Sequence, residues 1–129
     1  MKSLQKIVRQ SDVAKTSFSE LAALQPQLVL AFGSVTAIRG AAATLMQAFP
    51  QAQLAGCSTA GEISTEGVED GTLVTTALRF DTTDVRQSTT RLEGMDDSKA
   101  AGVRLGEALP QQGLRAVLIF GQGVEINGS

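Results

Sequence analysis

The stretch that decides the fold is QLVLAFGSVTAIRGAAATLMQAFPQAQLAGC, which covers residues 27–57. Its first six residues, 27–32, form an apolar run of strand length. Apolar residues then recur at helical spacing from 37 to 49, and Pro50 stops that pattern. Residues 53–57 are apolar again and predict a second short buried strand. This order of strand, helix and strand is typical of an α/β domain.

The sequence on either side of this unit adds further elements. Upstream, residues 3–10 predict a strand, and residues 11–24 predict a helix whose N-cap is Ser11 or Asp12. Downstream, residues 73–80 alternate between apolar and polar types, and the Thr-rich residues 85–92 are more polar. We expect these two segments to pair as an antiparallel hairpin.

The last third of the chain predicts a helix over residues 96–109, followed by the most apolar run, residues 115–120. Because 115–120 is apolar at consecutive positions, we expect a central strand covered on both faces. The complete pattern predicts an α/β fold with a mixed sheet of about six strands and three helices, containing an antiparallel hairpin. In a doubly wound pattern a helix should follow 115–120, so we expect residues 1–129 to be the N-terminal part of a longer protein.

The composition argues against several classes of function. The chain has 129 residues, a net charge of -2, one cysteine, and no His, Trp or Tyr. Without His there is no imidazole base, so we expect no enzyme. The weak negative charge and the lack of Trp and Tyr argue against nucleic acid, and no apolar stretch is long enough for a membrane. The lone cysteine and the absence of a secretory signal predict a cytoplasmic location.

The loop GCSTAGEI, residues 56–63, follows the 53–57 strand and carries one thiol and two hydroxyls between two glycines, with one carboxylate directly after the second glycine. Ligands of open α/β sheets bind beyond the carboxyl ends of the strands. The candidate ligand-binding residues are therefore Gly56, Cys57, Ser58, Thr59, Ala60, Gly61 and Glu62. We expect Gly33, Ser34 and Gly121 at the same edge, because the apolar runs before Gly33 and Gly121 both end in Phe-Gly.

Four interpretations of this loop stay open on the residue types alone. A phosphate cradle would need a Lys where Glu62 stands. A nucleophile at Cys57 or Ser58 would lack a His to activate it. A metal site would need ligands clustered at short spacing, which the loop does not have. A plain turn, with Cys57 as a small buried hydrophobic residue, is the fourth.

The octapeptide GCSTAGEI resembles the signature of the N-terminal half of FIST domains. The 28–34 strand and Phe120-Gly121 agree with that family's layout. The resemblance implies a bacterial sensory domain that binds a small ligand, with amino acids as the proposed ligands. It also implies a second, C-terminal half that this chain lacks. The partner would be a histidine kinase or a cyclic-di-nucleotide enzyme.

The resemblance also suggests roles for the loop residues. Ser58 and Thr59 would orient polar groups of the ligand. Glu62 would either pair with a ligand amine or stay structural. Gly56 and Gly61 would permit the geometry of the loop. A separate alternative is a protein-docking module that binds no small ligand.

One branch of the family, the NosP proteins, is similar to this sequence and binds haem to sense nitric oxide. Haem iron is held by His, Cys, Met or Tyr side chains. This chain offers Cys57, Met1, Met46 and Met95, and we expect Met46 in the hydrophobic core. Haem as a cofactor would therefore need a His from the C-terminal half.

Overall fold

The computed structural model describes residues 1–64 and 67–121, and the chain divides into two compact units. The first unit is Met1–Val85 and the second begins at Arg86.

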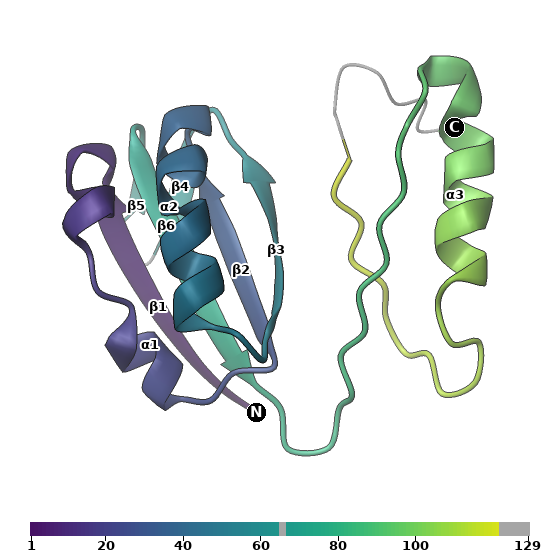
Figure 1. Cartoon of the computed structure of the whole chain (residues 1–129), viewed down its shortest axis with the longest axis horizontal. Coiled ribbons are helices and arrows are strands. Elements are labelled where there is room, and N and C mark those ends of the chain that lie inside the picture. Colours follow the sequence, from purple (N-terminus) through teal and green to yellow (C-terminus); the bar gives the residue numbers. More distant parts are fainter. Residues whose placement is uncertain (65–66, 122–129) are drawn as a thin grey trace. The chain divides into compact units, whose positions relative to one another are not determined.

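The first unit is built on a four-stranded mixed sheet (Figure 1). The strands are β1 (Lys2–Arg9), β2 (Leu28–Gly33), β3 (Gln53–Ser58) and β6 (Thr72–Arg79). Their order across the sheet is β1-β6-β2-β3. β6 runs antiparallel to both β1 and β2, whereas β2 and β3 are parallel. Because of these directions, β1, β2 and β3 end at the same edge of the sheet, and β6 begins there.

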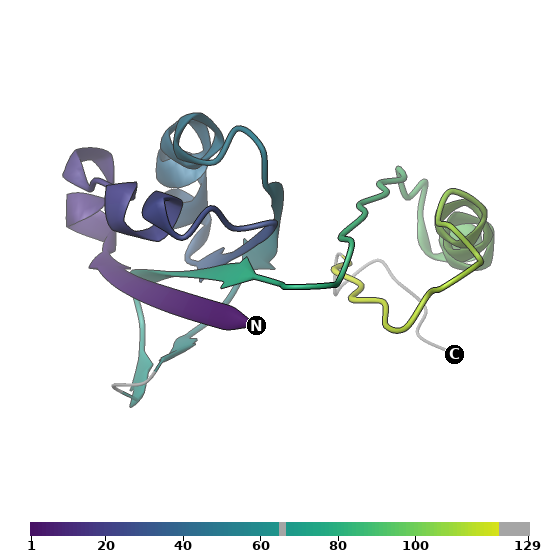
Figure 2. The same ribbon diagram turned by 90° about the horizontal axis from the view of Figure 1, so that it is seen from below.

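The helices of this unit lie on one face of the sheet (Figure 2). They are a 3₁₀ helix, η1 (Gln10–Lys15), and the α-helices α1 (Ser19–Ala23) and α2 (Val35–Ala48). The buried core between helices and sheet consists of Val8, Val13, Phe18, Leu21, Val29, Ala31, Ala37, Ala41, Leu45, Phe49, Leu73 and Ala77.

The sequence of helix α2 explains where the helix begins and which of its faces packs against the sheet. Its N-cap is Ser34, whose Oγ accepts a hydrogen bond from the Ala37 amide at 3.1 Å. Its buried side chains Ala37, Ala41 and Leu45 are four residues apart, which aligns them on one helical face. The helix therefore presents a narrow apolar stripe to the sheet.

A short hairpin stands on the other side of the sheet from the helices (Figure 2). It consists of β4 (Glu62–Ser64) and β5 (Gly67–Glu69), which are antiparallel. Its register pairs Glu62 with Glu69.

The second unit contains the 3₁₀ helix η2 (Met95–Asp97) and helix α3 (Ser98–Glu107). Arg104 of α3 donates hydrogen bonds to both carboxylate oxygens of Asp97, at 3.0 and 2.7 Å. It also donates to Thr90 Oγ1 and to the Arg91 carbonyl, which ties the irregular segment before η2 to the helix. Among the described residues of both units, every helix is too short or too polar to cross a membrane.

The predicted fold class is confirmed. Within residues 1–64 and 67–121 the structure is α/β, with six strands in a four-stranded mixed sheet and a two-stranded antiparallel one, and with three α-helices. The strands expected at 3–10, 27–32, 53–57 and 73–80 are present within about two residues. The expected helix over 37–49 is α2.

Two predicted strands are wrong. Residues 85–92 are irregular and do not pair with β6, because β1 and β2 already occupy both edges of β6. Residues 115–120 are irregular and exposed rather than central in a sheet. No strand occurs among the described residues of the second unit. Residues 115–120 therefore have no neighbouring strand there with which to form backbone hydrogen bonds.

Two details of the helices also differ from expectation. The single helix predicted over 11–24 is broken between η1 and α1. Val13 and Phe18 are both buried, and five residues of continuous helix would place them on different faces. Met46 is 61% exposed instead of buried, because it lies next to Leu45 on the outer side of the apolar stripe of α2.

The hydroxyl of Thr75 sits in the core without a hydrogen-bond partner among the described residues. Thr75 lies in β6 and is fully buried. An unpaired buried hydroxyl costs free energy that a methyl group does not. We therefore expect Thr75→Val to raise the free energy of unfolding by about 1 kcal/mol, measured by urea denaturation.

The neighbouring Thr76 is the matched control for this change. Its Oγ1 accepts a hydrogen bond from Gln5 Nε2 at 3.1 Å, so Thr76→Val removes a contact and should not stabilise the fold. Equal or lower stability of Thr75→Val would show that its hydroxyl is satisfied in solution.

Candidate functional site

The carboxyl ends of β2 and β3 meet at one edge of the sheet, as the sequence predicts for a ligand-binding edge. Gly33 pairs with Ser58 at the last position of the two strands. One residue further, the Thr59 amide donates to the Gly33 carbonyl at 3.0 Å. The structure therefore brings Gly33, Ser34, Ser58 and Thr59 together. Of these residues Ser58 is exposed, so its hydroxyl is accessible.

Glu62 is a buried carboxylate with both oxygens in hydrogen bonds. Its side chain is 2% exposed. Oε1 accepts from the Thr59 hydroxyl at 2.7 Å. Oε2 accepts from the Thr72 amide at 3.1 Å and from the Thr72 hydroxyl at 2.8 Å. Glu62 thus joins the end of the GCSTAGEI loop to the start of β6.

These contacts decide the protonation of Glu62. Burial raises the pKa of the carboxyl group, but the hydrogen bonds from Thr59 and Thr72 outweigh it and hold the pKa below its ordinary value. Glu62 is therefore ionised at neutral pH. Its engaged oxygens favour the structural role over pairing with a ligand amine.

The other predicted site residues lie in several different places. Gly56 lies inside β3 opposite Ala31, and it allows the two backbones to approach closely. Cys57 is half-buried in the same strand, whereas Ala60 is exposed and Gly61 turns the chain with φ +153°. Gly121 belongs to the second unit and lies in its exposed irregular segment.

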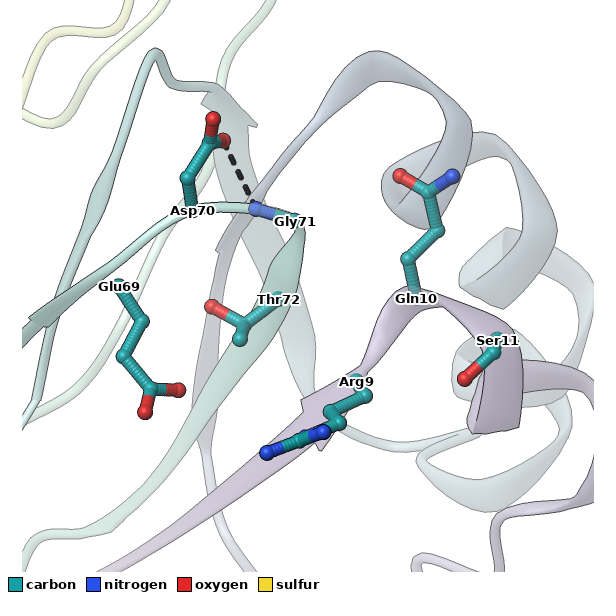
Figure 3. A pocket seen from close by; sticks show the side chains of 7 residues that line it. All are labelled: Arg9, Gln10, Ser11, Glu69, Asp70, Gly71 and Thr72. Atoms are coloured by element: carbon teal, nitrogen blue, oxygen red, sulfur yellow. Dashed lines mark hydrogen bonds between the residues drawn. The ribbon is translucent and has the colours of Figure 1, made fainter.

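A pocket of about 450 Å³ lies at the same sheet edge, between the end of β1 and the turn from β5 to β6 (Figure 3). It is lined by Arg9, Gln10, Ser11, Glu69, Asp70, Gly71 and Thr72. None of these seven residues was predicted from the sequence to belong to a site. The one feature that could have pointed to them is the Asp70-Gly71 turn, which comes directly before a predicted strand.

Two of the predicted residues, Ser34 and Glu62, form hydrogen bonds with residues that line this pocket. Ser34 Oγ donates a hydrogen bond to Gln10 Oε1. Glu62 holds Thr72 through its amide and hydroxyl, as described above. The predicted loop and the pocket are therefore adjacent parts of one polar edge.

The edge of the pocket is held by backbone contacts between distant parts of the chain. The Gln10 amide donates to the Gly71 carbonyl at 2.9 Å, which joins η1 to the turn. The Gly71 amide donates to Asp70 Oδ1 at 2.8 Å, a bond drawn in Figure 3. Gly71 has φ +71°, a conformation that glycine adopts readily, which suits the Asp-Gly sequence of this turn.

The sulfur atoms that could ligate a haem iron do not gather at the pocket. The polar pocket contains neither a thiol nor a thioether, and Cys57 is half-buried in β3. Met1, Met46 and Met95 are 73%, 61% and 56% exposed, so none of their sulfur atoms is enclosed for axial ligation. Within the described part of the chain, no group of three or more His, Cys, Asp or Glu residues is placed to hold a metal ion.

The family model for the FIST N domain matches residues 27–129. No curated protein and no solved structure matches the chain. The matched residues include the GCSTAGEI loop and one wall of the pocket, whereas Arg9 lies outside them.

Proposed function

The chain belongs to the FIST N domain family, which is a family of signal-transduction sensory domains, and we propose that it binds a small, amino-acid-like ligand at the polar edge of its sheet. Ligand binding would regulate a signalling partner such as a histidine kinase or a cyclic-di-nucleotide enzyme. The sensory role agrees with a chain that has no His to serve as a catalytic base.

One observation carries the location of the proposed site. The polar ends of β2 and β3, the start of β6 and a pocket of about 450 Å³ all lie at the same edge of the sheet. Open α/β sheets bind ligands at this edge, because backbone amides and short polar side chains converge there. A pocket of this volume has room for a ligand of amino-acid size.

The proposal is tested by thermal denaturation of the chain in the presence of each standard L-amino acid in turn. A ligand that binds the folded state raises the denaturation temperature as its concentration rises. If no amino acid raises it, the ligand class is wrong, and the docking-module alternative becomes the explanation to test.

A change at Ser58 tests whether the ligand lies beside the GCSTAGEI loop. Its exposed hydroxyl is free to donate a hydrogen bond to a ligand at the end of β3. For an amino acid that binds beside the loop, we expect Ser58→Ala to weaken affinity about fivefold in isothermal titration calorimetry, the effect of one neutral hydrogen bond. For a ligand that binds only in the pocket, this change should leave affinity unaltered, because Ser58 does not line the pocket. Ser3→Ala, at the far end of β1, is the matched control. Unchanged affinity in Ser58→Ala would remove this residue from the site.

A further inference from the structure

Two opposite charges point toward one another across the pocket. Figure 3 shows the guanidinium of Arg9 and the carboxylate of Glu69 directed toward the same space, with Thr72 between them. Among residues 1–64 and 67–121, neither group forms a hydrogen bond or an ion pair. An isolated cation and an isolated anion on opposite walls are suited to a ligand that carries both charges.

We propose that this pocket binds the two charged groups of a zwitterionic ligand, with Arg9 binding its carboxylate and Glu69 its ammonium group. This assignment rests on the proposed function for the ligand being amino-acid-like. The planar guanidinium of Arg presents paired N–H donors that match the two oxygens of a carboxylate. The carboxylate of Glu69 accepts hydrogen bonds from an ammonium group, which has only donors.

Both charged residues stand on a framework of paired strands. Arg9 pairs with Thr72 at the end of the β1–β6 ladder. Glu69 pairs with Glu62 across the hairpin, and the Glu62 side chain is hydrogen-bonded to Thr72. Thr72 is thus connected to both walls of the pocket. This support fixes the backbone positions from which the two charged side chains extend.

Asp70 is the other acidic residue of the pocket, and its contacts give it a different role. Its Oδ1 accepts a hydrogen bond from the Gly71 amide, and its side chain points away from Arg9 in Figure 3. Asp70 therefore stabilises the turn rather than the ligand. This difference between neighbouring carboxylates provides a control inside the pocket.

The test compares an amino acid that binds in the denaturation screen with two of its derivatives. The primary amide lacks the carboxylate, and the N-acetyl derivative lacks the ammonium group. For the native chain, calorimetry should show each derivative binding about tenfold more weakly, a typical loss for one solvent-accessible charged hydrogen bond. Arg9→Met should abolish the preference for the acid over the amide. Glu69→Gln should abolish the preference for the free amine over the N-acetyl derivative.

Three controls separate this assignment from general effects. Arg39→Met and Asp70→Asn, which change an exposed cation on α2 and the turn residue, should leave both preferences intact. Affinity should also fall as salt is added, because the two binding groups are exposed. If an amino acid binds but both pocket variants keep both preferences, this assignment is wrong while the proposed function stands. If no amino acid binds the native chain, both are wrong.

Discussion

Replacing Gly56 by alanine is expected to prevent stable folding of the first unit. A Cβ atom at this position would lie 1.8 Å from the Ala31 carbonyl oxygen and 2.8 Å from its carbonyl carbon. These are backbone atoms of the paired strand β2, so no side chain can rotate away to relieve the overlap. Gly56 also has φ +154°, which a residue with a side chain rarely adopts. We expect a loss of about 4 kcal/mol or more, a large part of the stability of a small domain.

Gly61 offers a matched control for this prediction. It has nearly the same backbone angle, φ +153°, but the nearest atom to its added Cβ is 3.8 Å away. Gly61→Ala therefore introduces the backbone strain without the collision, and it should cost only about 1 to 2 kcal/mol. Urea denaturation followed by circular dichroism measures both variants. Equal losses in the two variants would show that β2 and β3 can separate to accept the methyl group.

Replacing Glu62 by alanine is expected to cost about 3 kcal/mol of unfolding free energy, because three hydrogen bonds end on its buried carboxylate. The change leaves the Thr72 amide without its partner in a buried position. It also removes the link that holds the start of β6 against the loop. Glu62→Gln should cost less, about 1 kcal/mol, because an amide can keep the acceptor for Thr72 and donate to the Thr59 hydroxyl. Glu69→Gln, in the exposed residue opposite, should change stability little.

The dependence of stability on pH provides a second measurement of the same contacts. The pKa of Glu62 in the folded chain lies below its ordinary value of 4.5, so ionised Glu62 stabilises the fold at all pH values above 4.5. This contribution is lost as the pH falls below 4.5 and passes through the folded pKa. Asp81 and Asp97 also have lowered pKa values, because of hydrogen bonds from the N-terminus and from Arg104, so the total loss in acid is not due to Glu62 alone.

The difference between the native chain and Glu62→Gln isolates the carboxylate. We expect their unfolding free energies to differ most at neutral pH and to converge as the pH falls below 4.5. A difference that stays constant through this range would mean that Glu62 has an ordinary pKa in the folded chain. The contacts with Thr59 and Thr72 would then be weaker than their distances imply.

These two residues also explain why the GCSTAGEI loop is both a family signature and a structural requirement. Gly56 allows β3 to approach β2, and Glu62 connects the loop to β6. The Glu62 side chain is buried and Gly56 has no side chain, so neither residue offers a functional group to a ligand in the described structure. The motif thus shapes the polar edge from within, while the exposed groups of the pocket come from other parts of the chain.

The spacing of apolar residues was enough to predict the central unit of strand, helix and strand, because this spacing depends only on local geometry. Ala37, Ala41 and Leu45 could be assigned to one buried face in this way, and the octapeptide identified the family. The conformation of Gly56 was also anticipated, since glycine suits a close backbone approach.

Only the tertiary structure decided which strands pair and which polar groups meet. The expected hairpin of 73–80 with 85–92 was replaced by the long-range ladders of β6 with β1 and β2. Strand pairing is chosen by burial across the whole fold, and alternation of apolar residues within one strand does not encode its neighbours. The pocket could not be predicted from the sequence for the same reason. Arg9 and Glu69 are far apart in sequence, and only the pairing of Arg9 with Thr72 places both of them at one pocket.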